Sequence, residues 1–224
     1  MRPTEAQAIG RILSELPDNA IEPILNLGSS TADFRTNMQP HIEYEIFAPL
    51  RARGTTVLHA DIKADDGVDL AGDVYDLEYR ARILALSPML IICSNMLEHL
   101  EDREGFLEMC DHMLPPGGHL LLTVPSDYPY HQDPIDNYFR PDVTELAALL
   151  PDYDIIWSEL VVDTNFLADL RAMSMSERLR RIKALAKAPY LYFADRARFL
   201  GRYHRWLWLF RNYSIACVLL RKPG

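Results

Sequence analysis

Two histidines of this chain could accept a proton from a bound molecule. His99 closely follows an almost continuously apolar segment, 88–94, and His131 lies in a polar and aromatic segment, 128–141. Because an imidazole ring titrates near neutral pH, either one could act as the base that deprotonates a hydroxyl group during its reaction. Each could instead be structural, His99 hydrogen-bonded beneath a loop and His131 exposed on one, and the sequence leaves both interpretations open.

The segment 128–141 has the composition of a loop that binds a polar molecule carrying a ring. The residues expected to contact such a substrate are aromatic, acidic or basic: Tyr130, Asp133, Asp136, Tyr138 and Arg140. Glu98, beside His99, is expected to orient backbone or loop groups rather than to act as a base. Although histidines and acids lie near one another in this part of the chain, no metal site is expected.

A second group of residues suits the binding of a nucleoside. The apolar stretch 24–27 ends at Gly28, and the small residues after it would let a ligand approach the backbone. Asp61 ends another apolar stretch, and its carboxylate could accept both ribose hydroxyl hydrogens or could serve as a turn acid. The glycine patterns of dinucleotide-binding dehydrogenases and of phosphate-binding loops are both missing from the sequence, which disfavours those two classes.

Apolar periodicity predicts the elements that must position these residues. Seven strands are predicted, at 23–28, 55–61, 68–73, 88–94, 119–124, 154–162 and 213–221. Helices are predicted at 4–16, 40–53, 77–86, 103–114 and 142–150, and 33–37 is expected to be a loop. This alternation favours an α/β fold: a Rossmann-like, doubly wound, mostly parallel seven-stranded sheet with helices on both faces. Ligands bind such a sheet at the carboxyl ends of its strands.

Five motifs occur in order along about residues 20–150. They are Ile-Leu-Asn-Leu-Gly-Ser-Ser-Thr at 24–31, His-Ala-Asp-Ile at 59–62, Ala-Gly-Asp-Val at 71–74, Cys-Ser-Asn-Met-Leu-Glu-His-Leu at 93–100 and Leu-Pro-Pro-Gly-Gly-His-Leu at 114–120. Together they resemble the motifs of the class I S-adenosylmethionine-dependent methyltransferases. The similarity is greatest to the group whose fourth strand ends in a Glu-His pair.

This resemblance implies S-adenosylmethionine as cofactor and methyl transfer to a small-molecule or glycan-like acceptor, most simply at oxygen. It implies cofactor contacts from Asn26, Gly28, Ser29, Ser30, Asp61, Ile62, Asp73, Val74, Asn95 and Leu97, with Asp73 at the adenine amino group. His99 or His131 would be the catalytic base.

The cofactor loop departs from the family pattern at three positions. The family commonly has an acid where Asn26 stands and glycines where Ser30 and Ala32 stand. The alternative function is therefore a methyltransferase-like binding or scaffold module that has lost catalysis and docks through its C-terminal arm.

The charge of the chain is divided unevenly along its length. The net charge is −9, but residues 1–170 hold 30 acids against 10 Lys and Arg, and residues 171–224 hold 2 acids against 13. We expect one domain over 1–224, with its core at about 20–163 and 213–221 and a basic, aromatic helical insertion at about 165–211. Helices are expected there at 174–188 and 196–211.

The insertion could pack on its own domain, form a lid, form a dimer face, or lie on an anionic membrane through 196–211. The chain would be a monomer or a homodimer. Nucleic acid is a poor partner because the body is acidic.

The remaining composition points to a reducing compartment. The three cysteines are far apart and form no Cys-x-x-Cys pair, and no apolar segment approaches the length of a membrane span. The N-terminal residues lack the apolar core of a signal peptide. We therefore expect a cytoplasmic protein, either free or peripheral to the inner face of the membrane.

Overall fold

A seven-stranded sheet forms the centre of the protein, whose computed structural model describes residues 1–131 and 135–224. Its strand order is β3-β2-β1-β4-β5-β7-β6, and β7 runs antiparallel to both of its neighbours while the other pairs are parallel. The strands are β1 (Ile24–Leu27), β2 (Val57–Asp61), β3 (Leu70–Ala71), β4 (Leu90–Ser94), β5 (His119–Asp127), β6 (Asp154–Asn165) and β7 (Asn212–Arg221). The predicted α/β sheet is therefore confirmed.

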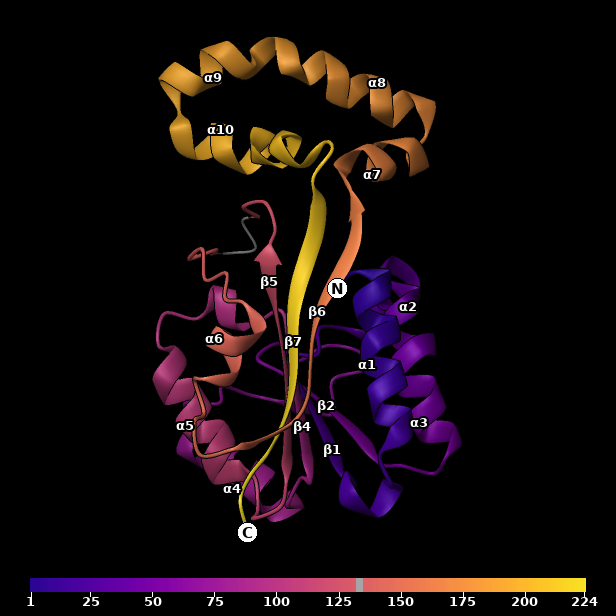
Figure 1. Cartoon of the computed structure of the whole chain (residues 1–224), viewed down its shortest axis with the longest axis vertical. Helices are drawn as coiled ribbons and strands as arrows, with labels where there is room; N and C mark the ends of the chain where they lie inside the picture. Colours follow the sequence, from indigo (N-terminus) through magenta and orange to yellow (C-terminus); the bar gives the residue numbers. More distant parts are fainter. Residues whose placement is uncertain (132–134) are drawn as a thin grey trace.

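Helices cover both faces of this sheet (Figure 1). On one side lie α1 (Pro3–Glu15), α2 (Pro40–Ile42) and α3 (Ala48–Ala52), and on the other α4 (Leu77–Leu86), α5 (Arg103–Met113) and α6 (Val143–Ala147). Side chains alternate between the two faces along each strand, so Ile24 and Ile92 pack beneath α1 while Leu25 and Ile91 pack beneath α5. Both faces are apolar, as expected for central parallel strands.

The segment predicted as a loop at 33–37 is instead helical. Phe34–Met38 form a π-helical turn, and a second one at Glu43–Phe47 joins α2 to α3. The cause lies in Arg35, whose buried guanidinium donates hydrogen bonds to the carbonyl oxygens of Ser29 at 2.9 Å, Ser30 at 2.6 Å and Gly67 at 2.7 Å. Arg35 thereby ties this turn to the loop that follows β1.

A helical insertion, residues 166–211, separates β6 from β7. It contains α7 (Phe166–Ala172), α8 (Met175–Ala184), α9 (Ala188–Ala194) and α10 (Arg196–Tyr203), and it lies beyond the body at the end of the β6–β7 ribbon (Figure 1). The predicted helix at 174–188 corresponds to α8 and the 3-10 turn Leu185–Lys187, after which α9 continues the helical chain (Figure 1). The predicted helix at 196–211 ends early, at Tyr203, and a 3-10 turn at His204–Trp208 follows it. Among the described residues, no helix is long and apolar enough to span a membrane.

Candidate active site

A cavity of about 870 Å³ lies at the carboxyl ends of the parallel strands, where a doubly wound sheet binds its ligands. Nine of the ten residues predicted to contact a cofactor line it: Asn26, Gly28, Ser29, Ser30, Asp61, Ile62, Asp73, Val74 and Asn95. Leu97 does not, because it begins the 3-10 turn Leu97–His99 and its side chain is fully buried in the core.

The turn after β1 has a backbone that few side chains would permit. Gly28 has φ +72°, and a Cβ built there would lie 2.8 Å from the sulfur of Met96. Ser30 also has a positive φ, of 54°, and its N–H donates to Asp61 Oδ2 at 2.8 Å. Asp61 therefore holds the turn in place while its carboxylate borders the cavity. The turn is formed even though Ser30 replaces a glycine.

Asn26 is paired with a buried histidine of the neighbouring strand. Its side-chain amide lies 3.1 Å from His59 Nδ1, and both residues are buried. Burial, with Arg35 nearby, lowers the pKa of His59 to about 4, so the ring is neutral at pH 7 and Nδ1 can accept from the amide. An amide at position 26 suits this neutral partner.

Charged residues that sequence reasoning missed also line the cavity, among them Glu5 and Arg205. Glu5 is buried at the start of α1, and its Oε1 accepts hydrogen bonds from Asn95 Nδ2 and Thr123 Oγ1, both at 2.7 Å. The available signal was an acid four residues before Ile9, on the apolar stripe of the helix. Arg205 reaches the cavity from the insertion, which therefore contributes to its wall.

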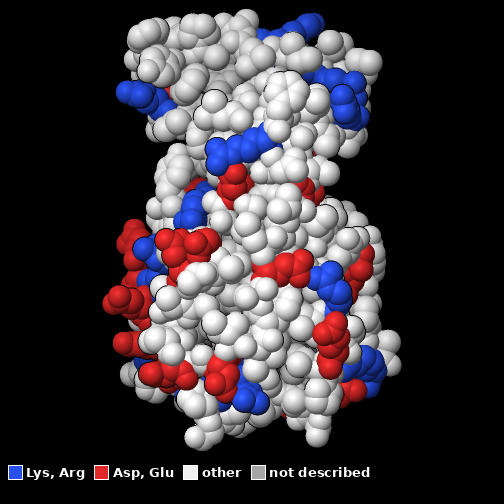
Figure 2. All heavy atoms as spheres, in the orientation of Figure 1, with Lys and Arg blue, Asp and Glu red and all other residues white. Residues whose placement is uncertain are grey.

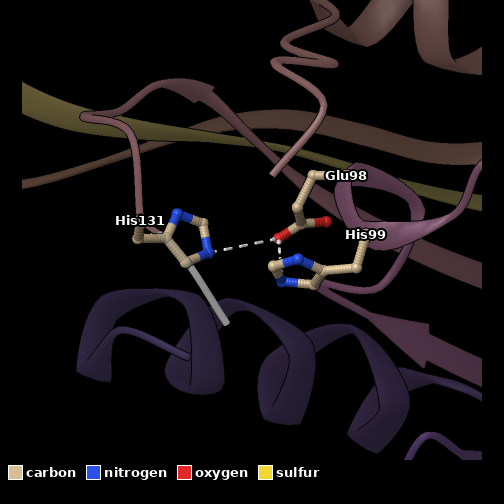
Figure 3. A group of neighbouring side chains, drawn as sticks. All are labelled: Glu98, His99 and His131. Atoms are coloured by element: carbon tan, nitrogen blue, oxygen red, sulfur yellow. Dashed lines mark ion pairs between the residues drawn. The ribbon is translucent and has the colours of Figure 1, made fainter. Parts of the chain in front are cut away.

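Glu98, His99 and His131 meet at the edge of this cavity (Figure 3). The Glu98 carboxylate lies between the two imidazole rings, with Oε1 at 3.7 Å from His99 Nε2 and 3.9 Å from His131 Nε2. Glu98 has no exposed surface, and neither of its oxygens has a hydrogen-bond partner among the described residues. Burial raises the pKa of Glu98 to about 8 and lowers the pKa of His131.

The described residues that were predicted to bind substrate do not line the cavity, and one of them, Asp136, contacts His131. Asp136 is buried, accepts the His131 N–H at 3.0 Å, and pairs with Arg140 at 2.5 Å. Tyr130 and Tyr138 stack on each other with ring centroids 5.1 Å apart, and Tyr138 is about half exposed. The remaining predicted residue, Asp133, lies outside the described residues.

Comparisons with known proteins identify the fold. No family model matches the sequence, and no curated protein matches it. Among solved structures, the chain is similar to a SAM-dependent methyltransferase from Archaeoglobus fulgidus, at 13% identity over 99% of this chain and 95% of that chain, with a TM-score of 0.55. It is also similar to coclaurine N-methyltransferase bound to N-methylheliamine and SAH, at 14% identity over 98% of this chain and 70% of that chain, with a TM-score of 0.51. The fold is that of the SAM-dependent methyltransferases.

In this methyltransferase fold, the cavity occupies the edge of the sheet where the loops after β1, β2 and β4 converge. Glu98, His99 and His131, which we call the Glu98 cluster, lie toward the β4 and β5 side of the cavity. Asp61 and Asp73 lie toward the β2 and β3 side. The cavity thus has an end suited to a nucleoside and an end rich in titratable groups.

Proposed function

We propose that the protein transfers a methyl group from S-adenosylmethionine to an oxygen of a small-molecule or glycan-like acceptor. The observation that carries this proposal is that these groups line the same cavity at one edge of the sheet: the turn at Gly28, the carboxylates of Asp61 and Asp73, and the rings of His99 and His131. Its volume of about 870 Å³ suits a nucleoside cofactor together with a small acceptor.

The residues at the β2 and β3 end of the cavity fit the cofactor. Asp61 would accept the ribose hydroxyls, Asp73 the adenine amino group, and the backbone of the turn at Gly28 would border the methionine part. Gly28 supports this role, because its positive φ shapes the turn and its lack of a Cβ lets a ligand approach the backbone closely. The bound cofactor supplies the activated methyl group, and the protein aligns it with the acceptor.

The residues at the β4 and β5 end of the cavity fit an acceptor that must lose a proton. Both imidazoles line the cavity, and either His99 or His131 would hold the proton of an acceptor hydroxyl as the methyl group arrives. Asp136 positions His131, since it accepts the backbone N–H and its carboxylate lies 3.4 Å from the ring nitrogen Nδ1. Asp136 and Arg140 are therefore assigned to positioning His131 and not to direct contact with the acceptor.

Isotope-labelled S-adenosylmethionine, offered with separate pools of hydroxyl and amine compounds, tests this function by mass spectrometry. We expect labelled ether or ester products, lost in H131A and retained in H112A, because His112 lies on α5 and hydrogen-bonds to its own helix. Products from the amine pool alone would contradict oxygen methylation. Binding of the cofactor without any product would favour the scaffold function.

A second proposed activity is contact with an anionic membrane surface through the insertion. Its α9 and the segment after α10 expose large apolar side chains, with exposed fractions of 86% for Phe193, 77% for Phe210 and 72% for Tyr190. The Lys and Arg of the insertion lie mainly on the adjoining helices α8 and α10, and Figure 2 shows blue residues over the insertion and mostly red ones over the body. Basic helices next to exposed aromatic side chains suit the interface of an anionic bilayer.

Liposome co-sedimentation tests this contact. We expect the protein to pellet with vesicles containing phosphatidylserine and not with neutral vesicles, and the double variant R198E/R202E to lose binding. Charge reversal at Arg82, which is exposed on α4 of the body, is the matched control and should leave binding unchanged. Equal pelleting of all three proteins would contradict the proposal.

A further inference from the structure

We propose that Glu98, His99 and His131 form a binding site for a divalent first-row transition-metal ion, with Zn²⁺ as the best match. The three side chains each offer one donor atom, and these atoms all lie within 4.8 Å of one another. No other function described above explains why a buried carboxylate points between two imidazole rings (Figure 3).

The distances are close to those of a metal centre. Glu98 Oε1 lies 3.7 Å from His99 Nε2 and 3.9 Å from His131 Nε2. A tetrahedral zinc ion with bonds of about 2.0–2.2 Å holds its donor atoms about 3.3 Å apart. The two separations from Glu98 would need to shorten by roughly half an ångström on binding. The donor atoms of the two imidazoles, which lie within 4.8 Å of each other, would also have to approach through rotation of these side chains.

The second nitrogen of each ring lies near an oxygen. His99 Nδ1 is hydrogen-bonded to the carbonyl oxygen of Ile135, whereas His131 Nδ1 lies 3.4 Å from Asp136 Oδ2 without forming a hydrogen bond to a described residue. A proton on Nδ1 in both rings leaves both Nε2 lone pairs directed toward Glu98. Histidines that bind metals in proteins typically hold their other nitrogen in this way, against a carbonyl or a carboxylate.

The Glu98 carboxylate supplies a second, independent observation that points to a ligand. Its side chain has no exposed surface, and both carboxylate oxygens lack a hydrogen-bond partner among residues 1–131 and 135–224. A buried carboxylate without a partner is costly, and such groups are normally paired with a cation or bound to a metal. The two Nε2 atoms that face this carboxylate are neutral acceptors when Nδ1 carries the proton.

The donor set selects the kind of ion. Two imidazoles with one carboxylate suit zinc and its neighbours in the first row, whereas Mg²⁺ and Ca²⁺ prefer oxygen ligands. Three protein ligands leave a coordination position open, as in catalytic zinc sites. Since His99 and His131 both line the cavity, that position would face its interior.

An ion at this place would also deepen the proposed function, and it would take the place of the imidazole base, because both Nε2 atoms would bind the ion. The acceptor hydroxyl would bind to the ion and lose its proton to water, because the ion lowers the pKa of the bound oxygen. That oxygen would then form its bond to the methyl carbon as the carbon–sulfur bond of the cofactor breaks. This use of the ion rests on the proposed function, whereas binding of the ion does not.

The test is titration of the chelator-treated, full-length protein with Zn²⁺ by calorimetry and with Co²⁺ by visible absorption. We expect one equivalent of either ion, with the intense bands of four-coordinate Co²⁺. Binding should weaken by tenfold or more in E98Q and in H131A and stay unchanged in H112A. Saturating Zn²⁺ should also raise the melting temperature of the wild type, through its binding to the native state, but not that of E98Q.

The E98Q variant keeps the shape of the side chain and removes the carboxylate ligand, so it is expected to fold. Lack of saturable binding in the wild type, or equal binding in wild type, E98Q and H131A, would overturn the metal site. Titration of the same preparations with S-adenosylhomocysteine separates this outcome from failure of the methyltransferase function, because cofactor binding does not need the ion.

Discussion

At the scale of single residues, the cavity is held by buried polar pairs that join different strands and helices. Asn26 pairs with His59 across β1 and β2, and Glu5 accepts hydrogen bonds from Asn95 and Thr123 beyond β4 and on β5. Since unpaired buried groups are costly, each such pair fixes the position of the backbone around it.

The neutral state of His59 gives the stability of the protein a pH dependence. The pKa of His59 is about 4 in the folded protein and about 6.5 in an unfolded chain. Between those values the unfolded state binds more protons, so the free energy of unfolding falls as the pH drops from about 6.5 to 4, by up to about 3 kcal/mol. Above pH 6.5 the stabilisation is fully present.

Chemical denaturation at a series of pH values measures this effect. The variant H59N should show a shallower decline below pH 6.5 than the wild type, whatever its stability at pH 7. The exposed control H112N should decline as the wild type does. Identical slopes for H59N and the wild type would contradict a neutral, buried His59.

Some site residues can be placed from the sequence because they stand at the ends of predicted strands, whereas others can be placed only from the tertiary structure. Asp61 and Asp73 follow predicted strands, and the placement of both at the cavity could be predicted. Leu97 could not be placed, because the chain turns into a 3-10 turn after β4 and directs this side chain into the core. Asp136 and Arg140 are near His131 in sequence, but only the folded loop shows that they hold its ring and backbone.

At the scale of elements, the turn after β1 depends on glycine at one position. The variant G28A combines a left-handed backbone with a Cβ only 2.8 Å from Met96 Sδ, and we expect it to lose about 1–2 kcal/mol of stability and to weaken cofactor binding. The control G54A has a similar φ, of +87°, but open space around it. It should lose comparable stability with cofactor binding unchanged; equal binding in both variants would contradict a role for this turn.

The sequence predicts best those helices and strands whose apolar residues pack in the core around the central sheet. The alternation along β1 and β4 and the helical stripes of α1 and α5 are strong because both faces of the sheet are covered. The turn at Phe34–Met38 was missed because its order comes from Arg35, which bonds to carbonyls distant in sequence. The early end of α10 was missed for a similar reason, since Trp208 must pack with Phe166 and Tyr213 before β7 begins.

At the scale of the whole molecule, the boundary between the acidic and basic parts of the sequence lies close to the boundary between the body and the insertion. The acidic N-terminal part forms the sheet and its covering helices, and the basic segment forms the insertion beyond the end of β6 (Figures 1 and 2). Arg205 links the two, because it belongs to the insertion and lines the cavity. The uneven charge was visible in sequence, whereas the reach of the insertion to the cavity depends on the long β6–β7 ribbon.

The sequence could indicate that Glu98, His99 and His131 lie close together, but it could not show that their side chains converge on one point. Glu98 and His99 follow β4 and His131 follows β5, and these strands are parallel neighbours. Their ends therefore meet, but the directions of the three side chains depend on the 3-10 turn and on the contacts of Ile135 and Asp136.

The central claim is that this cavity binds S-adenosylmethionine with Asp61 at its ribose. The most direct test is calorimetric titration of S-adenosylmethionine and S-adenosylhomocysteine into the wild type, D61N and the exposed control D152N. D61N keeps an oxygen for the Ser30 N–H and loses the charge and one acceptor. We predict micromolar binding at one site, weakened by tenfold or more in D61N (about 1.4 kcal/mol or more) and unchanged in D152N. Absence of binding by the wild type, or equal binding by D61N, would contradict the claim.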